Sequence, residues 1–531
     1  MSRPQQSSAV APGVNPWIVA LTVTMATFME VLDTTIANVA LPHIAGGLGA
    51  GKSQSTWVLT SYLVANAIVL PLSGWFSNLI GRKRFYMACV FLFTVSSALC
   101  GMSRTLEELI FFRILQGAGG GGLQPSEQGI LVDTFPPEKR GMAMAVYGVA
   151  VVVAPVLGPT LGGWITDNYT WHWLFFINIP VGCLSLLLTS VIVQDPPHMA
   201  EERARSRRSG FKIDYVGICL VTLTFGSLEV VYAKGQEYDW FWSEFVMTFM
   251  AIAVVGLVVL VIWELRHPQP ILNLRLLKER NFAVTAVIIF IAFGALYGSN
   301  ANLPQMLQEL FGYDATRAGL VMSPTALFPM AAMPVVGFLL GRKTDARWLI
   351  GFGLICVTAG SYWQALLNLE ASPYTIIVPR SLQLFGMGFL FVPLNTAAYV
   401  YISANQTSNA SGLFNLVRNE GASFGIAVAT TMLDRRSQFH QLRLVEHIHS
   451  ANPHVATTLG ALTGQLDTAI GTAPAAADRQ GFAMLYQMVR EQARLMSYLD
   501  VFWLAAVGAA IVFPLVFVMR RAVSESGLAT H

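Results

Sequence analysis

Charged residues are scarce in this sequence. Among 531 residues there are 33 Lys+Arg and 30 Asp+Glu, so 12% are charged and the formal net charge is +3. A soluble chain of this length has about 25% charged residues with which to cover its water-facing surface, so a set of soluble domains is excluded. The small net charge argues against nucleic-acid binding, and the hydrophobic share of 54% argues against disorder.

Cysteine is also rare, with five residues in the chain. None belongs to a Cys-x-x-Cys pair, and each falls within an apolar run. We therefore expect small packing residues and neither a disulfide framework nor a zinc site. Four histidines between positions 440 and 454 have no ligand-like spacing, and no metal or other cofactor is predicted.

Long apolar runs dominate what is present. A helix needs about 20 mostly apolar residues to cross the bilayer core. We find fourteen such windows, which start near Trp17, Thr56, Lys83, Glu108, Gly141, Trp173, Asp214, Ser243, Phe282, Arg317, Trp348, Tyr374, Asn409 and Leu499. The sequence therefore predicts an all-α, fourteen-span membrane protein that is not an enzyme.

Basic residues predict the direction of these spans. The N-terminal segment has no basic n-region or cleavage site of a signal peptide, so we expect the first span to be retained. If both termini are cytoplasmic, the inside loops hold 20 Lys and Arg, whereas the short outside loops hold 4. The positive-inside rule favours this topology.

Two short motifs recur in order along the chain. Gly81-Arg82-Lys83 returns at 341–343, and the Arg113 to Gln116 motif returns as Arg-x-Leu-Gln at 380–383, with separations of 260 and 267 residues. A same-direction repeat of six-span halves is a transporter architecture, with the substrate site between the halves near the midplane.

The repeat divides the chain into six parts. We expect a cytoplasmic N-terminal tail (1–16), an N-terminal six-helix half (17–195), a basic cytoplasmic loop (196–213), two extra transmembrane helices (214–264), a cytoplasmic linker (265–281) and a C-terminal six-helix half (282–531) that includes an outer loop (434–498).

Ionisable residues within the predicted spans are candidates for function, because a charge at mid-bilayer costs about 2.5–3.5 kcal/mol. Span one carries Glu30 and Asp33, and span four carries a polar stripe that starts at Arg113 and runs through Gln116, Gln124 and Glu127. We expect Asp33 to face Arg113 and to exchange protons, with Glu30 and Glu127 as further carriers. The alternative is a static ion pair that holds the helices together.

Two other arginines lie within predicted spans. Arg380 occupies the repeat position of Arg113, where we expect it near the outer interface with its side chain extended toward the headgroups. Arg418 is expected about one turn inside the cytoplasmic end. A structural pairing is the favoured interpretation for both.

Small residues and prolines crowd spans four and five. Glycines occur at 117 and 119–122, and span five holds Pro155, Gly158, Pro159 and Gly162. Such residues allow close helix contact and helix bending. Tight packing and a kinked pair that slides or seals during a transport cycle both fit this pattern.

The outer loop, Asp434 to Tyr498, has a middle rich in Ala, Thr, Gly and Pro, which indicates mobility. Its end, Phe482 to Leu499, has helical periodicity. We expect an amphipathic helix there that lies on the membrane or docks a partner.

The chain resembles the fourteen-span drug:proton antiporters of the major facilitator superfamily, of the EmrB/QacA type. Leu32 to Pro42 matches a signature of that family in span one, and Gly74 to Arg84 resembles its loop between spans two and three, with Asn78 in place of the usual acidic residue. Further similar stretches are Leu109 to Gly117, Gly148 to Gly163 and Trp173 to Gly182.

The resemblance implies proton-driven export of hydrophobic or amphiphilic toxic compounds from the bacterial inner membrane. It also implies a periplasmic adaptor of the membrane-fusion class and an outer-membrane channel as partners. Polar residues expected in the substrate cavity are Thr34, Asn38, Gln116, Gln124, Gln383 and Asn395, and those expected in gating and packing motifs are Gly74, Gly81, Arg82, Pro155, Gly158, Pro159 and Gly162.

Two other functions remain open on the sequence. One is a proton-independent nutrient facilitator on the same fold. The other is a membrane-bound sensor or scaffold with the basic loops Gln194–Lys212 and Leu265–Arg280 as its output, although these lack a folded output domain. Substrate identity, proton stoichiometry and oligomeric state are not predicted.

Overall fold

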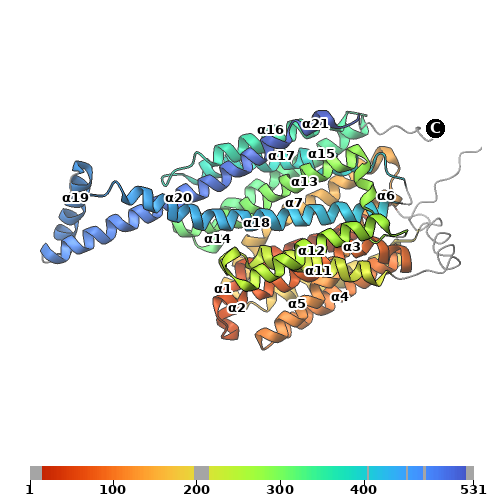
Figure 1. The fold of residues 1–531 in the computed structure, drawn as a ribbon, viewed down its shortest axis with the longest axis horizontal. Coiled ribbons are helices and arrows are strands. Elements are labelled where there is room, and N and C mark those ends of the chain that lie inside the picture. The colour runs from red at the N-terminus through yellow and green to blue at the C-terminus, as the bar shows by residue number, and fades with distance from the viewer. Residues whose placement is uncertain are drawn as a thin grey trace, which may run out of the picture.

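The computed structural model describes residues 15–195, 214–268, 270–403, 406–449, 452–470 and 474–521. The expected basic loop and nearly all of the N-terminal tail lie outside the described residues. Helices form a long bundle, from one end of which a helical arm projects (Figure 1).

The first group of helices comprises α1 (Pro16–Leu48), α2 (Lys52–Ser55), α3 (Trp57–Ile80), α4 (Arg82–Met102), α5 (Leu106–Gly120), α6 (Leu123–Thr134), α7 (Pro137–Asn168), α8 (Trp173–Phe176) and α9 (Asn178–Ile192). After residue 213 come α11 (Tyr215–Lys234), η1 (Trp240–Trp242), α12 (Glu244–Arg266) and η2 (Leu274–Lys278). The last group comprises α13 (Arg280–Phe311), α14 (Ala315–Met322), η3 (Ser323–Ala326), α15 (Leu327–Gly341), α16 (Ala346–Gln364), α17 (Pro373–Tyr399), α18 (Thr407–Val445), α19 (Pro453–Ile470), α20 (Pro474–Val512) and α21 (Leu515–Val518).

Side-chain caps mark where several helices begin. The Asn15 side chain accepts a hydrogen bond from the backbone N–H of Trp17 at the start of α1, and Thr105 does the same for Glu108 at the start of α5. Asp214 caps α11 in this way. Each cap satisfies one of the backbone donors that a helix start leaves free.

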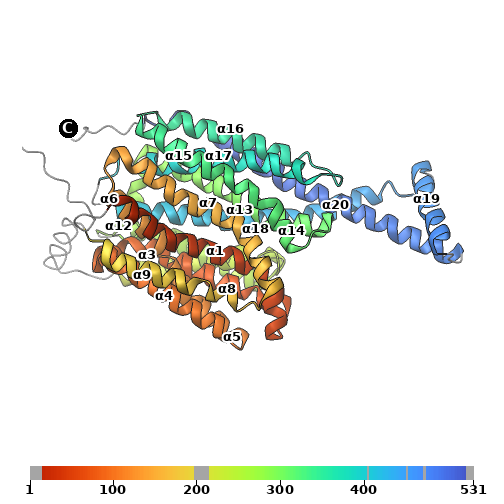
Figure 2. The ribbon, with the colours of Figure 1, turned by 180° about the vertical axis from the view of Figure 1, so that it is seen from behind.

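Eleven segments of the described chain are long and apolar enough to cross a membrane. Three more helical stretches run along the bundle beside them: α16, α18 and the pair α5 and α6 (Figures 1 and 2). The observed helices therefore agree with the predicted all-α fold of fourteen spans. Span four is not one helix, however, because it is interrupted at Gly121 and Gly122.

Both ends of the described chain lie at the same end of the bundle. Trp17 at the start of α1 packs against Phe135 just after α6, with ring centroids 4.9 Å apart. Helix α21, close to the end of the described chain, lies toward the same end in Figure 1, opposite the arm. We call this end of the bundle the terminal end. A chain that crosses the bundle an even number of times begins and ends on the same side.

The predicted outer loop is a helical arm, not an irregular segment. Helix α18 continues to Val445, α19 follows, and α20 begins at Pro474, well before the expected start of the last span. Near the base of the arm, Asp500 of α20 accepts hydrogen bonds from Arg436 and His440 of α18 over 2.6 and 2.7 Å. The amphipathic segment from Phe482 therefore continues the last span outward instead of forming a separate surface helix.

Glycines allow the helices of the N-terminal half to approach closely. An ideal Cβ at Gly121 would lie 2.6 Å from the carbonyl oxygen of Asn66, and one at Gly158 would lie 2.6 Å from the Cβ of Thr35. Helix α7 stays continuous through Pro155 and Pro159. Tight packing of α5 against α3 and of α7 against α1 thus accounts for the small residues of spans four and five.

We predict that Gly158→Ala destabilises the protein, because the added methyl group overlaps Thr35 in a closely packed interface. The expected loss is about 1–3 kcal/mol. The measurement is the thermal unfolding midpoint of the detergent-solubilised protein. Gly46→Ala is the matched control, because no atom lies within 4 Å of its Cβ position; equal midpoints for the two variants would contradict the packing.

Candidate functional site

A buried ion pair joins α1 to α5. Nη1 of Arg113 donates a hydrogen bond to Oδ2 of Asp33 over 2.6 Å. The two residues are 0% and 2% exposed, so both charges are withdrawn from solvent. Removal of an ion from water costs several kcal/mol, and such a pair persists only when further hydrogen bonds accompany it. The expected meeting of Asp33 and Arg113 is confirmed.

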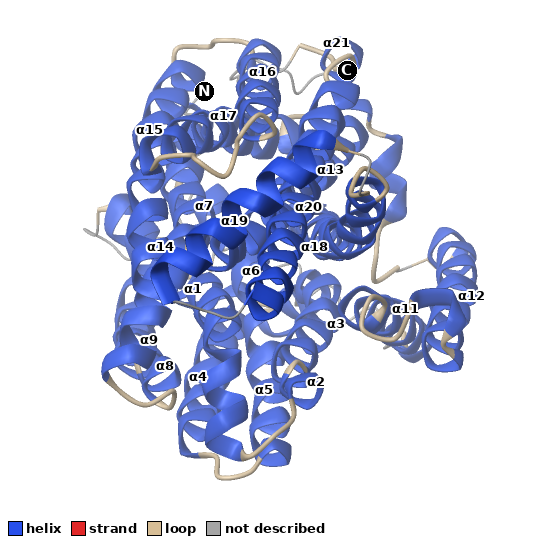
Figure 3. Cartoon of the chain, turned by 90° about the vertical axis from the view of Figure 1, so that its left-hand side faces the viewer, coloured by secondary structure: helices blue, strands red, loops and turns tan. Residues whose placement is uncertain are grey.

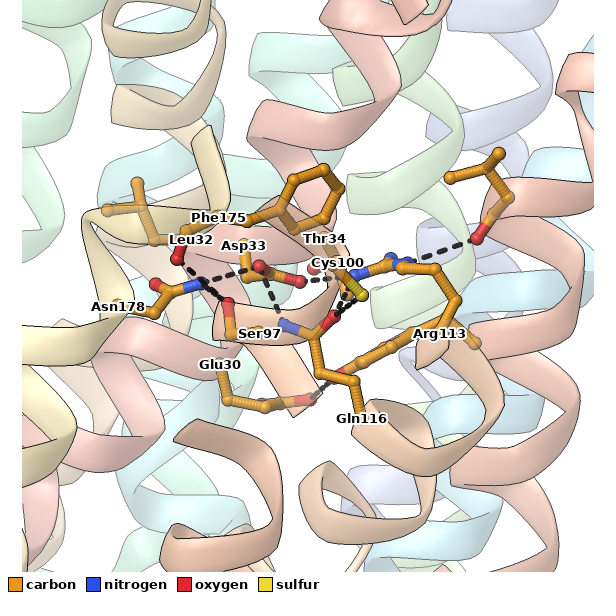
Figure 4. A network of polar contacts seen from close by, with 12 residues as sticks. Glu30, Leu32, Asp33, Thr34, Ser97, Cys100, Arg113, Gln116, Phe175 and Asn178 are labelled. Atoms are coloured by element: carbon orange, nitrogen blue, oxygen red, sulfur yellow. Dashed lines mark hydrogen bonds and ion pairs between the residues drawn. The ribbon is translucent and has the colours of Figure 1, made fainter. Parts of the chain in front are cut away.

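Amide side chains complete the surroundings of Asp33. Its Oδ1 accepts hydrogen bonds from Gln116 over 3.0 Å and from Asn178 of α9 over 2.6 Å, and Asn178 also donates to Ser97 of α4 (Figure 4). Asp33 thereby binds groups from two further helices besides its own. Asn178 lies in a stretch that the family resemblance drew attention to, but the sequence analysis did not place it in the site.

The guanidinium of Arg113 is held on several sides. Its Nε donates to the carbonyl oxygen of Val58 in α3 over 3.1 Å, and Nη1 also donates to Gln116 over 2.7 Å. The ring of Tyr62 lies 4.3 Å from the guanidinium carbon. Nη2 is buried without a hydrogen-bond partner among the described residues, so the cation retains one unused donor beside Asp33.

Glu30 lies one turn before Asp33 and, within the described part of the chain, has no direct cation partner. Its carboxylate accepts hydrogen bonds from Tyr62 over 3.0 Å, Asn66 over 3.4 Å and Gln124 over 2.8 Å. Tyr62 thus contacts both the Arg113 guanidinium and the Glu30 carboxylate. The two acidic groups of α1 are therefore neighbours in one polar layer.

Gln124 links Glu30 to the C-terminal half. Its side-chain oxygen accepts hydrogen bonds from Arg418 of α18 and, over 3.2 Å, from Tyr147 of α7. Arg418 also donates to the Tyr147 hydroxyl over 2.8 Å. Arg418 therefore has the structural pairing that was favoured for it, and its partners lie across the interface between the halves.

Glu127 is the most isolated of the predicted proton carriers. It is 0% exposed, and Oε1 accepts a hydrogen bond from Thr24 over 2.5 Å. Its other oxygen is buried without a partner among the described residues. Despite the break in span four, the predicted polar stripe meets α1 along its whole length, at Asp33, Glu30 and Thr24 in turn.

The repeated motif builds a different site in the C-terminal half. Arg380 is 1% exposed and hydrogen-bonds to Gln383 and to Asn300 of α13. The expected extension of Arg380 to the headgroups is wrong, because its side chain is enclosed by α13 and α17. An amide takes the place of the Asp33 carboxylate, so Arg380 forms no ion pair with any residue that the structure describes.

The residues predicted for the substrate cavity are dispersed over several places in the structure. Gln116 and Gln124 belong to the networks around Asp33 and Glu30, whereas Gln383 donates to Ser361 over 2.9 Å in the Arg380 site. Asn395 is 0% exposed. Thr34 is half-buried and Asn38 is exposed, and their contact with substrate stays a prediction.

Gln128 is the centre of a contact between the halves near the terminal end, and the sequence analysis missed it. Its amide donates to Asn395 over 3.2 Å, and its oxygen accepts hydrogen bonds from Tyr399, Ser411 and Asn415 over 2.8–3.0 Å. All five side chains come from the last part of span four, the end of α17 and the start of α18. A single glutamine next to the polar stripe has no periodicity of its own that would reveal partners in α17 and α18.

The loop between α3 and α4 is fastened to span four. Gly81 has φ of 100°, a left-handed conformation that favours glycine. Arg82 donates to the carbonyl oxygen of Gly129 over 2.7 Å and forms an ion pair with Asp133 of α6. Asp133, which was not predicted, supplies the acidic partner for this loop. Gly74, the other glycine of the predicted motif, is buried in α3. A gating role for these residues stays a prediction.

Comparison with known proteins identifies the family and the fold of the chain. The family model described as Major Facilitator Superfamily matches residues 23–426. The multidrug export protein EmrB of Haemophilus influenzae is 39% identical over 495 residues, which cover 92% of this chain and 93% of that protein. The fatty acid resistance protein FarB of Neisseria gonorrhoeae is 35% identical over 509 residues, or 96% and 97% of the two chains. The solved structure of the proton:xylose symporter XylE has a TM-score of 0.60 at 14% identity and covers 94% of this chain and 95% of that one, a likeness of fold alone.

We predict that Arg113→Met is more destabilising than Arg380→Met. The first substitution leaves the buried Asp33 carboxylate without its cation, a loss of about 3–5 kcal/mol. The second leaves only the neutral amides of Gln383 and Asn300 without a donor, about 1–3 kcal/mol. Unfolding of the detergent-solubilised variants measures both losses of stability. Addition of Asp33→Asn should restore part of the stability in the Arg113 variant and none in the Arg380 variant. Equal losses at the two positions would contradict this difference.

Proposed function

The chain belongs to the Major Facilitator Superfamily, and from this premise we propose that it exports hydrophobic or amphiphilic toxic compounds in exchange for protons. It is an EmrB-like multidrug transporter, a multi-pass membrane protein and not an enzyme. Its substrates are small molecules. The observation that carries the proton coupling is the Asp33 carboxylate, buried in the polar layer between α1 and α5 and held by a single guanidinium.

Asp33 has the surroundings of a group that exchanges a proton. Burial disfavours its charge, whereas Arg113 and two amide donors favour it. A change in solvent access on one side tips this balance, and protonation then removes the attraction that holds the guanidinium. Arg113 keeps Gln116 and the Val58 carbonyl oxygen as acceptors, so it can release Asp33 without losing all its partners.

Glu30 and Glu127 extend the same stripe toward the terminal end. Glu30 reaches the C-terminal half through Gln124 and Arg418. Protonation of Glu30 weakens that connection, and in our proposal this lets the two halves rock past each other. Glu127 has no cation partner among the described residues, which suits a neutral, proton-holding state in this conformation.

Alternating access uses the interface between the halves. Gln128 and its partners close the terminal end, and α7 contacts η3 through a hydrogen bond of 2.8 Å between Thr160 and Ser323. We place the substrate between the halves, beside Thr34 and Asn38, where inward proton flow drives its export. Relatives named for multidrug export and fatty acid resistance support a hydrophobic or amphiphilic substrate.

The positive-inside rule favours a cytoplasmic terminal end, with the protein in the bacterial inner membrane. The arm of α18, α19 and α20 then projects into the periplasm (Figure 1). At its base is a cavity of about 710 Å³ whose lining includes Glu309, Tyr486 and Arg490. We propose that the arm docks a membrane-fusion adaptor that leads to an outer-membrane channel.

We predict that Asp33→Asn abolishes substrate-driven proton movement, because an amide cannot exchange a proton at neutral pH. Proteoliposomes that enclose a pH-sensitive dye report proton flux when ethidium is added. Glu107→Gln is the matched control, since Glu107 is exposed at the start of α5 and its variant should behave as the native protein. Full proton flux in the Asp33 variant would remove this residue from the mechanism. Uptake of a polar solute by the native protein, independent of the proton gradient, would instead favour a facilitator.

A second prediction concerns the arm. Replacement of residues 446–478 by a short Gly-Ser linker removes α19 and leaves the bundle, so ethidium transport in proteoliposomes should persist. Drug resistance of cells that depend on this protein should fall to the level without it, because the adaptor loses its dock. Native resistance after the deletion would show that α19 is not needed for assembly.

A further inference from the structure

Two glutamates outside the described site are buried at the contact between α11 and α18. Glu229 of α11 is 1% exposed and Glu420 of α18 is 6% exposed. All four carboxyl oxygens are buried without a hydrogen-bond partner among the described residues. Helices α11 and α12 lie outside the two halves, and α11 packs against α3 and α18 (Figure 3). The proton mechanism above uses neither glutamate.

The register of α11 on α18 brings the two carboxyl groups together. Tyr232, about one turn after Glu229, has its ring 6.0 Å from that of Phe424, one turn after Glu420. Farther along, Trp240 and Gln236 donate hydrogen bonds to Thr431 and Asp434 of α18 over 3.1 and 3.2 Å, respectively. The two segments therefore run side by side in the same direction.

The glutamates themselves are neighbours in this register. Ser423 of α18, which lies beside the Glu229 carboxyl, is about one helical turn after Glu420. This proximity agrees with the ring contact one turn away. The two groups thus form one site, which we call the glutamate pair.

No cation of the surrounding helices is available to the glutamate pair among the described residues. Arg418, two residues before Glu420, lies about 200° around α18 and is directed to Tyr147 and Gln124. Lys234 of α11 pairs with Glu237 at the far end of its helix. Helices α3 and α6 contain no Lys or Arg, and α12 and α13 carry theirs only near their ends. The basic residues of α20 all lie in its arm portion, up to Arg494, and its acid Asp500 pairs with Arg436.

Of the tyrosines nearby, Tyr62 of α3 is bonded to Glu30, and Tyr297 of α13 packs on Phe293. Tyr232 is therefore the titratable group that faces the pair. Two carboxylates with no cation between them repel, and each also loses its hydration. The pair avoids both costs when it holds a proton, which both carboxyl groups then share as one titrating unit.

We propose that the glutamate pair is a second proton-binding site of the transport cycle, so that the extra helices take part in coupling instead of only enlarging the bundle. The proposal rests on the proton-driven export proposed above. The step is a simple protonation of one carboxylate, with no other bond formed or broken. Loss of that proton generates repulsion between α11 and α18 and displaces α18.

Helix α18 carries the effect to the central network. Its one face holds Arg418, which binds Gln124 and Tyr147 of the N-terminal half, and its other face holds Glu420. A shift of α18 against α11 therefore moves the arginine that connects the halves. Proton binding at the pair and at Asp33 would then act on the same rocking motion from two sides.

The test measures protons moved per ethidium in proteoliposomes, with both fluxes recorded together. The variants are Glu229→Gln, Glu420→Gln and the double substitution, because glutamine keeps the shape and removes the titration. Glu244→Gln, exposed at the start of α12, is the matched control. If Asp33 carries the other proton, the ratio should fall about twofold in the double variant and stay unchanged in the control.

An infrared spectrum of the full-length protein in D2O gives an independent readout. The native protein should show a protonated-carboxyl C=O band that decreases in the double variant and not in Glu244→Gln. An unchanged proton ratio, or an unchanged band, would overturn the second site. Failure of the proposed antiport is distinguishable, because the native protein would then show no ethidium-driven proton flux at all.

Discussion

The architecture of the N-terminal half depends on one constraint: a carboxylate in the interior of a membrane bundle must find donors within the bundle. Asp33 satisfies it with one guanidinium and two amides, which come from α5 and α9. Arg113 in turn needs the Val58 carbonyl oxygen and the face of Tyr62 in α3. Because each partner is itself buried, the relative positions of four helices are specified by the electrostatics of one side chain.

Close approach of the helices makes this polar cluster possible. The glycines of span four bring its backbone against α3, where a Cβ at Gly117 would overlap Tyr62 and one at Gly121 would overlap Asn66. Asn66 and Tyr62 are the α3 residues that hydrogen-bond to Glu30. The small residues and the buried acids are therefore parts of one arrangement, because larger side chains on α5 would separate the donors from the carboxylates that they satisfy.

The two halves share a motif but differ in charge. Arg113 meets a carboxylate, whereas its counterpart Arg380 meets Asn300 and Gln383. At this motif, and among the described residues, a fixed cation and an acid thus lie together in the N-terminal half alone. The C-terminal half contributes acid elsewhere, at Glu420, where it faces the extra helix α11 and not the substrate interface. The repeated motif therefore gives its arginine a charged partner in one half and neutral amide partners in the other.

The sequence by itself determined the helical spans, the polar stripe of span four and its orientation toward α1. These depend on apolar length and on the 100° rotation per residue, which are local properties. The tertiary structure decided which acids meet a cation: of the residues it describes, Asp33 does, while Glu127 and Glu229 do not. It also decided that the outer segment is a helical arm and that Arg380 is enclosed. Such outcomes depend on partners far along the chain, and no local pattern records the distance between them.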